Sequence, residues 1–98
     1  MQIPKQIAVG DVVYKINRQR TAKAQGALGQ INYAEHTIYV ATHDTRGNTL
    51  DAEEVADTFW HEVTHAILYD MDHPLCNDER FVTKFASVLS TTINSAKL

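Results

Sequence analysis

The segment from Asp51 to Tyr69 constrains the fold of this chain most, because it combines a helical apolar pattern with two histidines one turn apart. Asp51 can cap a helix here, and the acidic residues that follow complement the positive end of the helix dipole. Five apolar side chains recur at helical spacing: Val55, Phe59, Val63, Ala66 and Ile67. The pattern predicts one helix through about Tyr69, with Pro74 expected to stop any continuation.

The two histidines belong to an H-E-x-x-H motif, His61-Glu62-Val63-Thr64-His65. At about 100° per residue, His61 and His65 lie only about 40° apart around the helix, so both imidazoles can reach one ion. Glu62 flanks that face, where its carboxylate can reach a metal-bound water without being a ligand. The apolar side chains fall on the opposite side. We therefore expect a zinc site on an open face of this helix, with Glu62 as general base.

A second helix is predicted to follow and to supply the third ligand that a catalytic zinc site usually has. Asn77 or Asp78 can cap it, and its apolar residues again repeat at helical spacing: Phe81, Val82, Phe85, Val88, Leu89 and Ile93. Glu79 is the preferred ligand, because it lies in the first turn and shares a side with apolar residues that must pack on the first helix. Asp78 and His73 remain alternatives.

The first half of the chain has strand patterns instead. Residues 7–9 and 12–16 cluster β-forming side chains around a Gly10-Asp11 bend, and residues 29–33 and 37–40 predict a hairpin. Residues 18–26 are expected to form a loop or a frayed helical turn, and residues 42–50 a turn-rich connection. The predicted fold class is α+β, with residues 1–98 in one domain: a small N-terminal antiparallel sheet of about three strands, followed by two packed helices.

Charge and apolar content exclude several function classes. The net charge is −3, which gives no global attraction for nucleic acid or an anionic membrane, and the basic residues Lys15, Arg18, Arg20 and Lys23 are expected to form a solvated loop. No apolar run approaches the roughly 20 residues that span a bilayer, and no export signal is visible. The single cysteine, Cys76, fits a reducing compartment. We expect a cytoplasmic protein without nucleic-acid or membrane partners.

The sequence HEVTHAILY from His61 to Tyr69, followed by ERFVTKFA from Glu79 to Ala86, resembles the ImmA/IrrE-type metallopeptidases and their phage-borne, single-domain minigluzincin relatives. Those proteins carry H-E-x-x-H and then a glutamate that opens a helix of the form E-x-x-(A/V)-x-x-(F/L)-A. The predicted hairpin also resembles the short sheet that precedes their motif helix. The similarity covers roughly residues 5–95, and the two helices carry its specific pattern.

The resemblance implies a minimal zincin-like metallopeptidase domain of the gluzincin type, with zinc held by His61, His65 and Glu79 and with Glu62 as base. It implies hydrolysis of a peptide or protein substrate in a bacterial or phage-infected host cytoplasm. Residues 36–40 are expected to form an exposed strand, which either pairs with the substrate backbone by strand addition or is an ordinary edge strand. The alternative is a zinc-stabilised binding or regulatory module with little or no turnover. Four residues are candidates by type to stabilise the oxyanion: His36, Tyr39, His43 and Tyr69.

Overall fold

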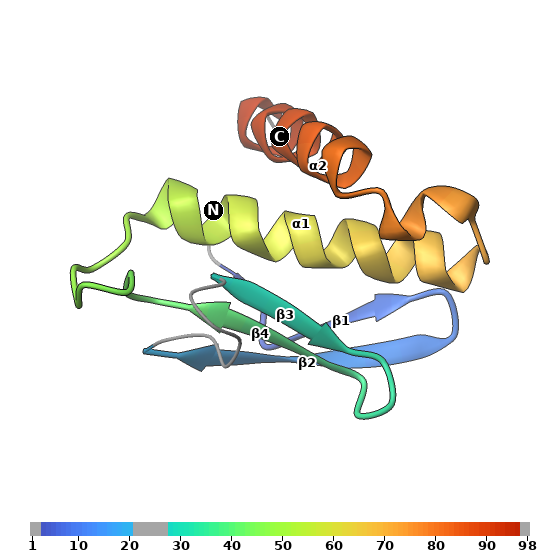
Figure 1. The fold of residues 1–98 in the computed structure, drawn as a ribbon, viewed down its shortest axis with the longest axis horizontal. Helices are drawn as coiled ribbons and strands as arrows, with labels where there is room; N and C mark the ends of the chain where they lie inside the picture. Colours follow the sequence, from blue (N-terminus) through green and yellow to red (C-terminus); the bar gives the residue numbers. More distant parts are fainter. Residues whose placement is uncertain (1–2, 21–27, 97–98) are drawn as a thin grey trace.

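A four-stranded sheet forms the base of the molecule, and two helices are stacked over one of its faces (Figure 1). The structure is a computed structural model that describes residues 3–20 and 28–96. Its strands are β1 (Gln6–Val9), β2 (Val12–Gln19), β3 (Gly29–Asn32) and β4 (Thr37–Ala41), and its helices are α1 (Ala52–Asp70), the short 3-10 helix η1 (Pro74–Asn77) and α2 (Glu79–Ser95). The strands precede the helices, and the predicted α+β class is confirmed.

The sheet is mixed and has four strands, in the order β1-β2-β4-β3, which corrects the predicted antiparallel sheet of about three strands. β1 and β2 form a hairpin around Gly10, whose φ of 58° lies in the left-handed region that glycine adopts without strain. β3 and β4 form the hairpin predicted from residues 29–33 and 37–40. The two hairpins join through the parallel pairing of β2 with β4. Parallel strands need a long connection, and the chain that runs from β2 through β3 to β4 provides it.

The segment predicted as a loop, residues 18–26, begins as strand. Arg18 and Gln19 extend β2 and pair with β4. The Arg18 guanidinium donates a hydrogen bond to the Ile3 carbonyl at 3.2 Å, while Lys15, Arg18 and Arg20 remain exposed to solvent. Residues 21–27, which include Lys23, lie outside the described part of the chain.

The core lies between the sheet and α1. Ile38 and Val40 of β4 and Phe59 of α1 are completely buried, and Val63 and Ala66 pack in the same cluster. The alternation of a strand directs Ile38 and Val40 to one face, and the helical period brings the α1 residues to one side. Full burial of a large apolar side chain contributes about 1.5–3 kcal/mol. These contacts therefore fix the rotation of α1 about its own axis.

α1 begins at its predicted cap. Asp51 Oδ1 accepts a hydrogen bond from the Glu54 backbone N–H at 2.8 Å, and the Asp51 N–H donates to Glu54 Oε1 at 3.4 Å, which completes a capping box. The helix ends at Asp70, close to the predicted end. Asp72 stops it by adopting a left-handed φ of 51°. Pro74, the expected stop, instead opens η1.

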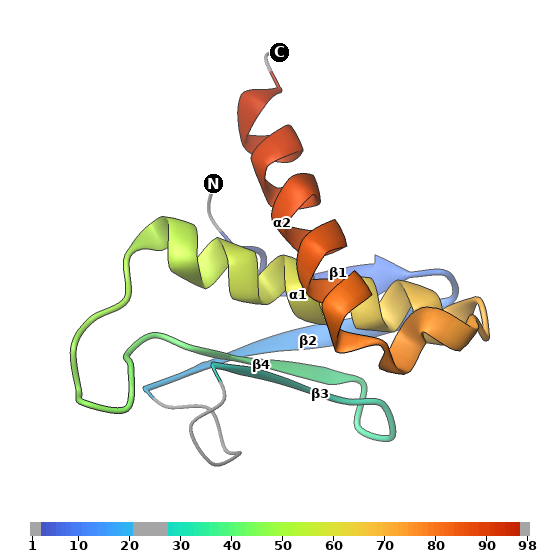
Figure 2. The same cartoon turned by 45° about the horizontal axis from the view of Figure 1, so that its top comes forward.

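α2 packs on α1 and η1 and forms the layer farthest from the sheet. Figure 2 shows α2 crossing α1, with its C-terminal half directed away from the sheet. Asp78, one of the two predicted caps, accepts a hydrogen bond from the Phe81 N–H at 3.0 Å. Val82 and Ala86 are buried, as predicted for the side that packs on α1. Within residues 3–20 and 28–96, no helix combines the length and apolar character needed to cross a membrane.

Candidate metal centre

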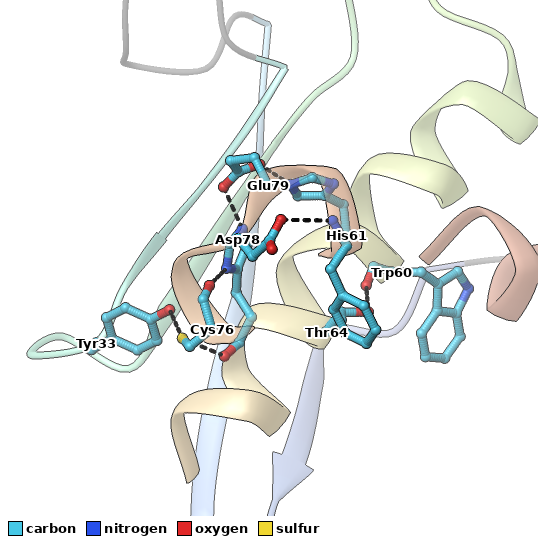
Figure 3. Close-up of polar contacts among 9 residues, drawn as sticks. Tyr33, Trp60, His61, Thr64, Cys76, Asp78 and Glu79 are labelled. Atoms are coloured by element: carbon cyan, nitrogen blue, oxygen red, sulfur yellow. Dashed lines mark hydrogen bonds and ion pairs between the residues drawn. The ribbon is translucent and has the colours of Figure 1, made fainter. Parts of the chain in front are cut away.

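Three side chains from the two long helices converge at one point. His61 and His65 lie one turn apart on α1, and Glu79 is the first residue of α2. Glu79 Oε2 lies 3.0 Å from His61 Nε2 (Figure 3). Glu79 Oε1 lies 2.8 Å from His65 Nε2. One ligand atom from each residue lies within 4.8 Å of the other two, so the group could hold a metal ion. The structure thus brings together the two histidines and the glutamate that the sequence favoured.

The hydrogen bonds of His65 determine which ring nitrogen is protonated. Nδ1 lies 2.7 Å from the Cys76 carbonyl oxygen, and a carbonyl only accepts, so Nδ1 carries a proton and donates it. Nε2 of a neutral His65 then presents a lone pair to a Glu79 oxygen at 2.8 Å, which is favourable only with a proton or a metal cation between them. Metal-ligating imidazoles usually donate their other N–H to a carbonyl or carboxylate in this way. Two nitrogens and a carboxylate oxygen are a donor set that fits zinc.

The other candidate ligands have structural roles. Asp78 caps α2, as described above. His73 caps η1, because its Nδ1 accepts a hydrogen bond from the Leu75 N–H at 3.1 Å. The Cys76 side chain is buried in a small apolar cluster. Within the described residues, neither Asp78, His73 nor the Cys76 sulfur belongs to the group that converges on one point.

A cleft of about 720 Å³ opens beside the three side chains, with walls from β3, α1 and α2. Glu62 lines it as well. Only 7% of Glu62 and 8% of His65 is exposed, because β3 and α2 cover this side of α1. The prediction of an open ligand face is therefore wrong for these two residues.

The surroundings of Glu62 raise the pKa of its carboxyl group above the ordinary value. Burial raises the pKa of Glu62 to about 7, and the negative charge of Glu79 adds to the rise. β3 approaches closely because it has a glycine there: a Cβ on Gly29 would lie 2.6 Å from Thr58 Cγ2 and 3.0 Å from Glu62 Oε2. A carboxyl group with a pKa near neutrality can both take up and release a proton at physiological pH. Glu62 thus has the acidity that proton transfer requires.

The free edge of the sheet beside the cleft is β3. Residues 37–41 form β4, which is buried and lies between β2 and β3, so the prediction of an exposed strand at residues 36–40 is wrong. Ala41 N donates to the Leu28 carbonyl at 2.8 Å. The alternation of antiparallel pairing then directs the backbone groups of Gly29 and Ile31 away from β4, towards the free edge. Such an edge can pair with a further strand.

None of the four residues considered for oxyanion stabilisation belongs to the described lining of the cleft: His36, Tyr39, His43 and Tyr69. Tyr33 lines it instead, stacked on Tyr69 with ring centroids 3.9 Å apart and with its hydroxyl 3.7 Å from Cys76 Sγ. Burial, together with the contact to Cys76, raises the pKa of the Tyr33 phenol, which therefore stays protonated. The sequence did not single out Tyr33, because a tyrosine that follows a strand has no distinguishing pattern.

No protein-family model, no curated protein and no solved structure matches this chain. What the molecule shows is a small α+β fold with a His-His-Glu group that could hold a metal ion.

Proposed function

We propose that this protein is a zinc-dependent peptidase in which His61, His65 and Glu79 bind the metal and Glu62 is the general base. Its substrate is a peptide or protein segment that lies along β3 in the cleft. The sequence resemblance to the ImmA/IrrE-type metallopeptidases supports the same assignment through the H-E-x-x-H motif and the glutamate that opens α2.

The observation that carries this proposal is that the converging group and the buried Glu62 carboxyl share one cleft. Structural zinc sites are usually closed by four protein ligands, whereas catalytic sites use three. A structural site also has no need for a further acid with a near-neutral pKa.

The residues of the cleft have distinct roles in peptide hydrolysis. A bound zinc ion supplies a Lewis acid that polarises the substrate carbonyl and lowers the pKa of water towards neutrality. Glu62 accepts the proton of the attacking water and delivers it to the nitrogen of the leaving amine. Tyr33 donates a hydrogen bond to the developing oxyanion, and the Gly29 and Ile31 backbone groups orient the substrate. The Cys76 carbonyl keeps the His65 ring in place.

Metal analysis combined with a cleavage screen tests the proposal. We expect about one zinc per chain, because the three donors converge on a single point. The zinc-loaded protein should cleave members of a broad peptide library, with the products identified by mass spectrometry. Failure to bind zinc would contradict the proposal outright.

The second candidate is a zinc-stabilised binding or regulatory module. The metal-binding side chains come from two different helices, which favours this candidate. A shared ion would hold the first turn of α2 against α1 and so link metal binding to folding. Zinc binding without cleavage of any library member would support this candidate over the peptidase.

Glu79→Gln is expected to weaken zinc binding by about 10-fold or more, because it replaces a charged ligand oxygen with an amide. Asp78→Asn is the matched control: it removes the same charge one residue away, and asparagine caps a helix as well as aspartate does. Competition with a chromogenic chelator measures both dissociation constants. Equal losses in the two variants would show that Glu79 acts only through its charge and is not a ligand.

The raised pKa of Glu62 predicts a pH-dependent stability of the metal-free protein. In the folded state Glu62 keeps its proton up to about pH 7, whereas the ordinary pKa of the side chain is 4.5. The free energy of unfolding therefore falls as the pH rises between these two values, and it stays lower at higher pH. Glu62→Gln removes this penalty. We expect the metal-free variant to be more stable than wild type near pH 8, by on the order of 2 kcal/mol or about 10 °C in Tm, and no more stable near pH 4.

Thermal unfolding in chelator across this pH range measures the effect. Glu53→Gln is the control, because Glu53 is exposed in the first turn of α1. A wild-type curve that runs parallel to that of Glu62→Gln at every pH would contradict the predicted penalty.

A further inference from the structure

One end of the cleft carries a carboxylate that the proposed chemistry does not use. Asp57 lies on α1 one turn before His61 and lines the cleft together with Thr83 and Ser87 of α2. Within residues 3–20 and 28–96, no hydrogen bond or ion pair engages the Asp57 carboxylate. The hydroxyl oxygens of threonine and serine can accept hydrogen bonds as well as donate them. These three side chains are exposed to solvent and add acceptor oxygens to the cleft.

The described lining of the cleft has no lysine or arginine that could compensate the negative charge of Asp57. That lining contains three acidic residues, Asp57, Glu62 and Glu79. A divalent ion bound by the His-His-Glu group offsets the charges of Glu79 and ionised Glu62. The charge of Asp57 then remains, on an exposed side chain that a cation of the substrate can reach from the cleft.

The direction of β3 determines which part of a bound peptide reaches this end. Gly29, at the start of β3, lies against Thr58 and Glu62, whereas Tyr33, just after its end, stacks on Tyr69. β3 therefore runs in the same direction as α1. A peptide added antiparallel to β3 runs in the opposite direction, from the Tyr33 end of the cleft towards Asp57. The residues that follow the cleaved bond thus lie at the Asp57 end.

We propose that Asp57, with Thr83 and Ser87, forms a subsite for the cationic side chain of a lysine or arginine that follows the cleaved bond. This specificity rests on the proposed peptidase function, because it names the substrate class of the same cleft. Asp57 precedes His61 by four residues, a rise of about 6 Å along α1, and an extended peptide rises about 3.3 Å per residue. The cation therefore belongs to the first or second residue after the cleaved bond.

Peptide binding tests the subsite without turnover. The full chain is used in its zinc-loaded form with Glu62→Gln, and short peptides capped at both ends carry one lysine at successive positions of a neutral sequence. We expect the amide resonances of Asp57, Thr83 and Ser87 to shift saturably in NMR titrations. The lysine peptide should bind about 3- to 10-fold more tightly than the same peptide with glutamate or norleucine. A norleucine peptide with a free amino terminus tests whether an α-amine can bind in place of the lysine side chain.

Two charge-matched variants identify the responsible residue. Asp57→Asn should remove the preference for lysine, whereas Asp11→Asn should keep it, because Asp11 lies in the β1–β2 turn at the edge of the sheet opposite β3. The proposal is overturned if the lysine peptide causes no saturable shift at these amides. It is also overturned if glutamate binds equally well, if the free amine alone accounts for the preference, or if both variants behave alike.

Cleavage by the wild-type chain separates this proposal from the one on which it rests. Cleavage without enrichment of lysine or arginine after the cleaved bond would remove the subsite and leave the peptidase function. Binding of the lysine peptide through Asp57 without any cleavage would remove the peptidase function and leave the cationic subsite.

Discussion

His65→Ala is expected to weaken zinc binding by more than about 100-fold, since even the loss of an outer hydrogen-bond partner of a zinc ligand costs about 10- to 100-fold. His65 is the more constrained of the two histidines: it is buried, and its Nδ1 is engaged by the Cys76 carbonyl at 2.7 Å, so that Nε2 is directed at the Glu79 carboxylate. Among the described residues, no further histidine, cysteine or acidic residue belongs to the group that could hold a metal ion. His61→Ala should have a similar effect, because it removes a second nitrogen from the same point.

His65→Ala is also expected to remove the part of the stability that depends on bound metal. A ligand present at 100 times its dissociation constant stabilises the folded state by about 2.7 kcal/mol, which is roughly 10 °C or more in Tm for a domain of this size. We therefore expect chelation to lower the Tm of the wild type by about this amount and to leave the Tm of His65→Ala unchanged.

His43→Ala is the control, because His43 lies outside the described lining of the cleft. Metal content by mass spectrometry and differential scanning calorimetry give the two readouts. Full zinc content in both His61→Ala and His65→Ala would disprove the site. A wild-type Tm that chelation does not change would show that the metal and the fold are not coupled.

Glu62→Gln is expected to keep zinc and to lower peptide hydrolysis by about 10²-fold or more, the usual scale for the loss of a general base. Glutamine keeps the shape of the side chain and fills the same space beside Gly29, but it cannot accept the proton. The His-His-Glu group that could hold a metal ion does not include Glu62, so the metal content should stay at the wild-type level.

The measurement is the rate of cleavage of a library peptide that the wild type hydrolyses, at equal zinc loading. Glu53→Gln serves again as the control for charge on α1. Equal rates for Glu62→Gln and wild type would refute the assignment of Glu62. A lowered rate accompanied by lost zinc would instead show that Glu62 supports the metal site.

Local sequence patterns predicted the elements of this fold and the chemical type of its site. The cap at Asp51, the cap at Asp78 (one of two candidates), the bend at Gly10 and the hairpin of β3 and β4 lie where short-range spacing placed them. The one-turn spacing of His61 and His65 on α1 follows from helical geometry alone. These features depend on interactions between residues close in sequence, and such interactions leave a periodic pattern that can be recognised before the chain is folded.

Only the tertiary structure decided how these elements form a cleft. The parallel pairing of β2 with β4 made β3 the edge strand, and the approach of Gly29 to α1 buried Glu62 and raised its pKa. The contact between His65 and the Cys76 carbonyl joins a side chain to a backbone oxygen, a group that every residue has and that no sequence pattern marks. Strand order, burial and backbone hydrogen bonds depend on contacts between residues far apart in the chain. The sequence determined which side chains could hold a metal ion, and the packing of β3 and α2 on α1 determined which of them meet.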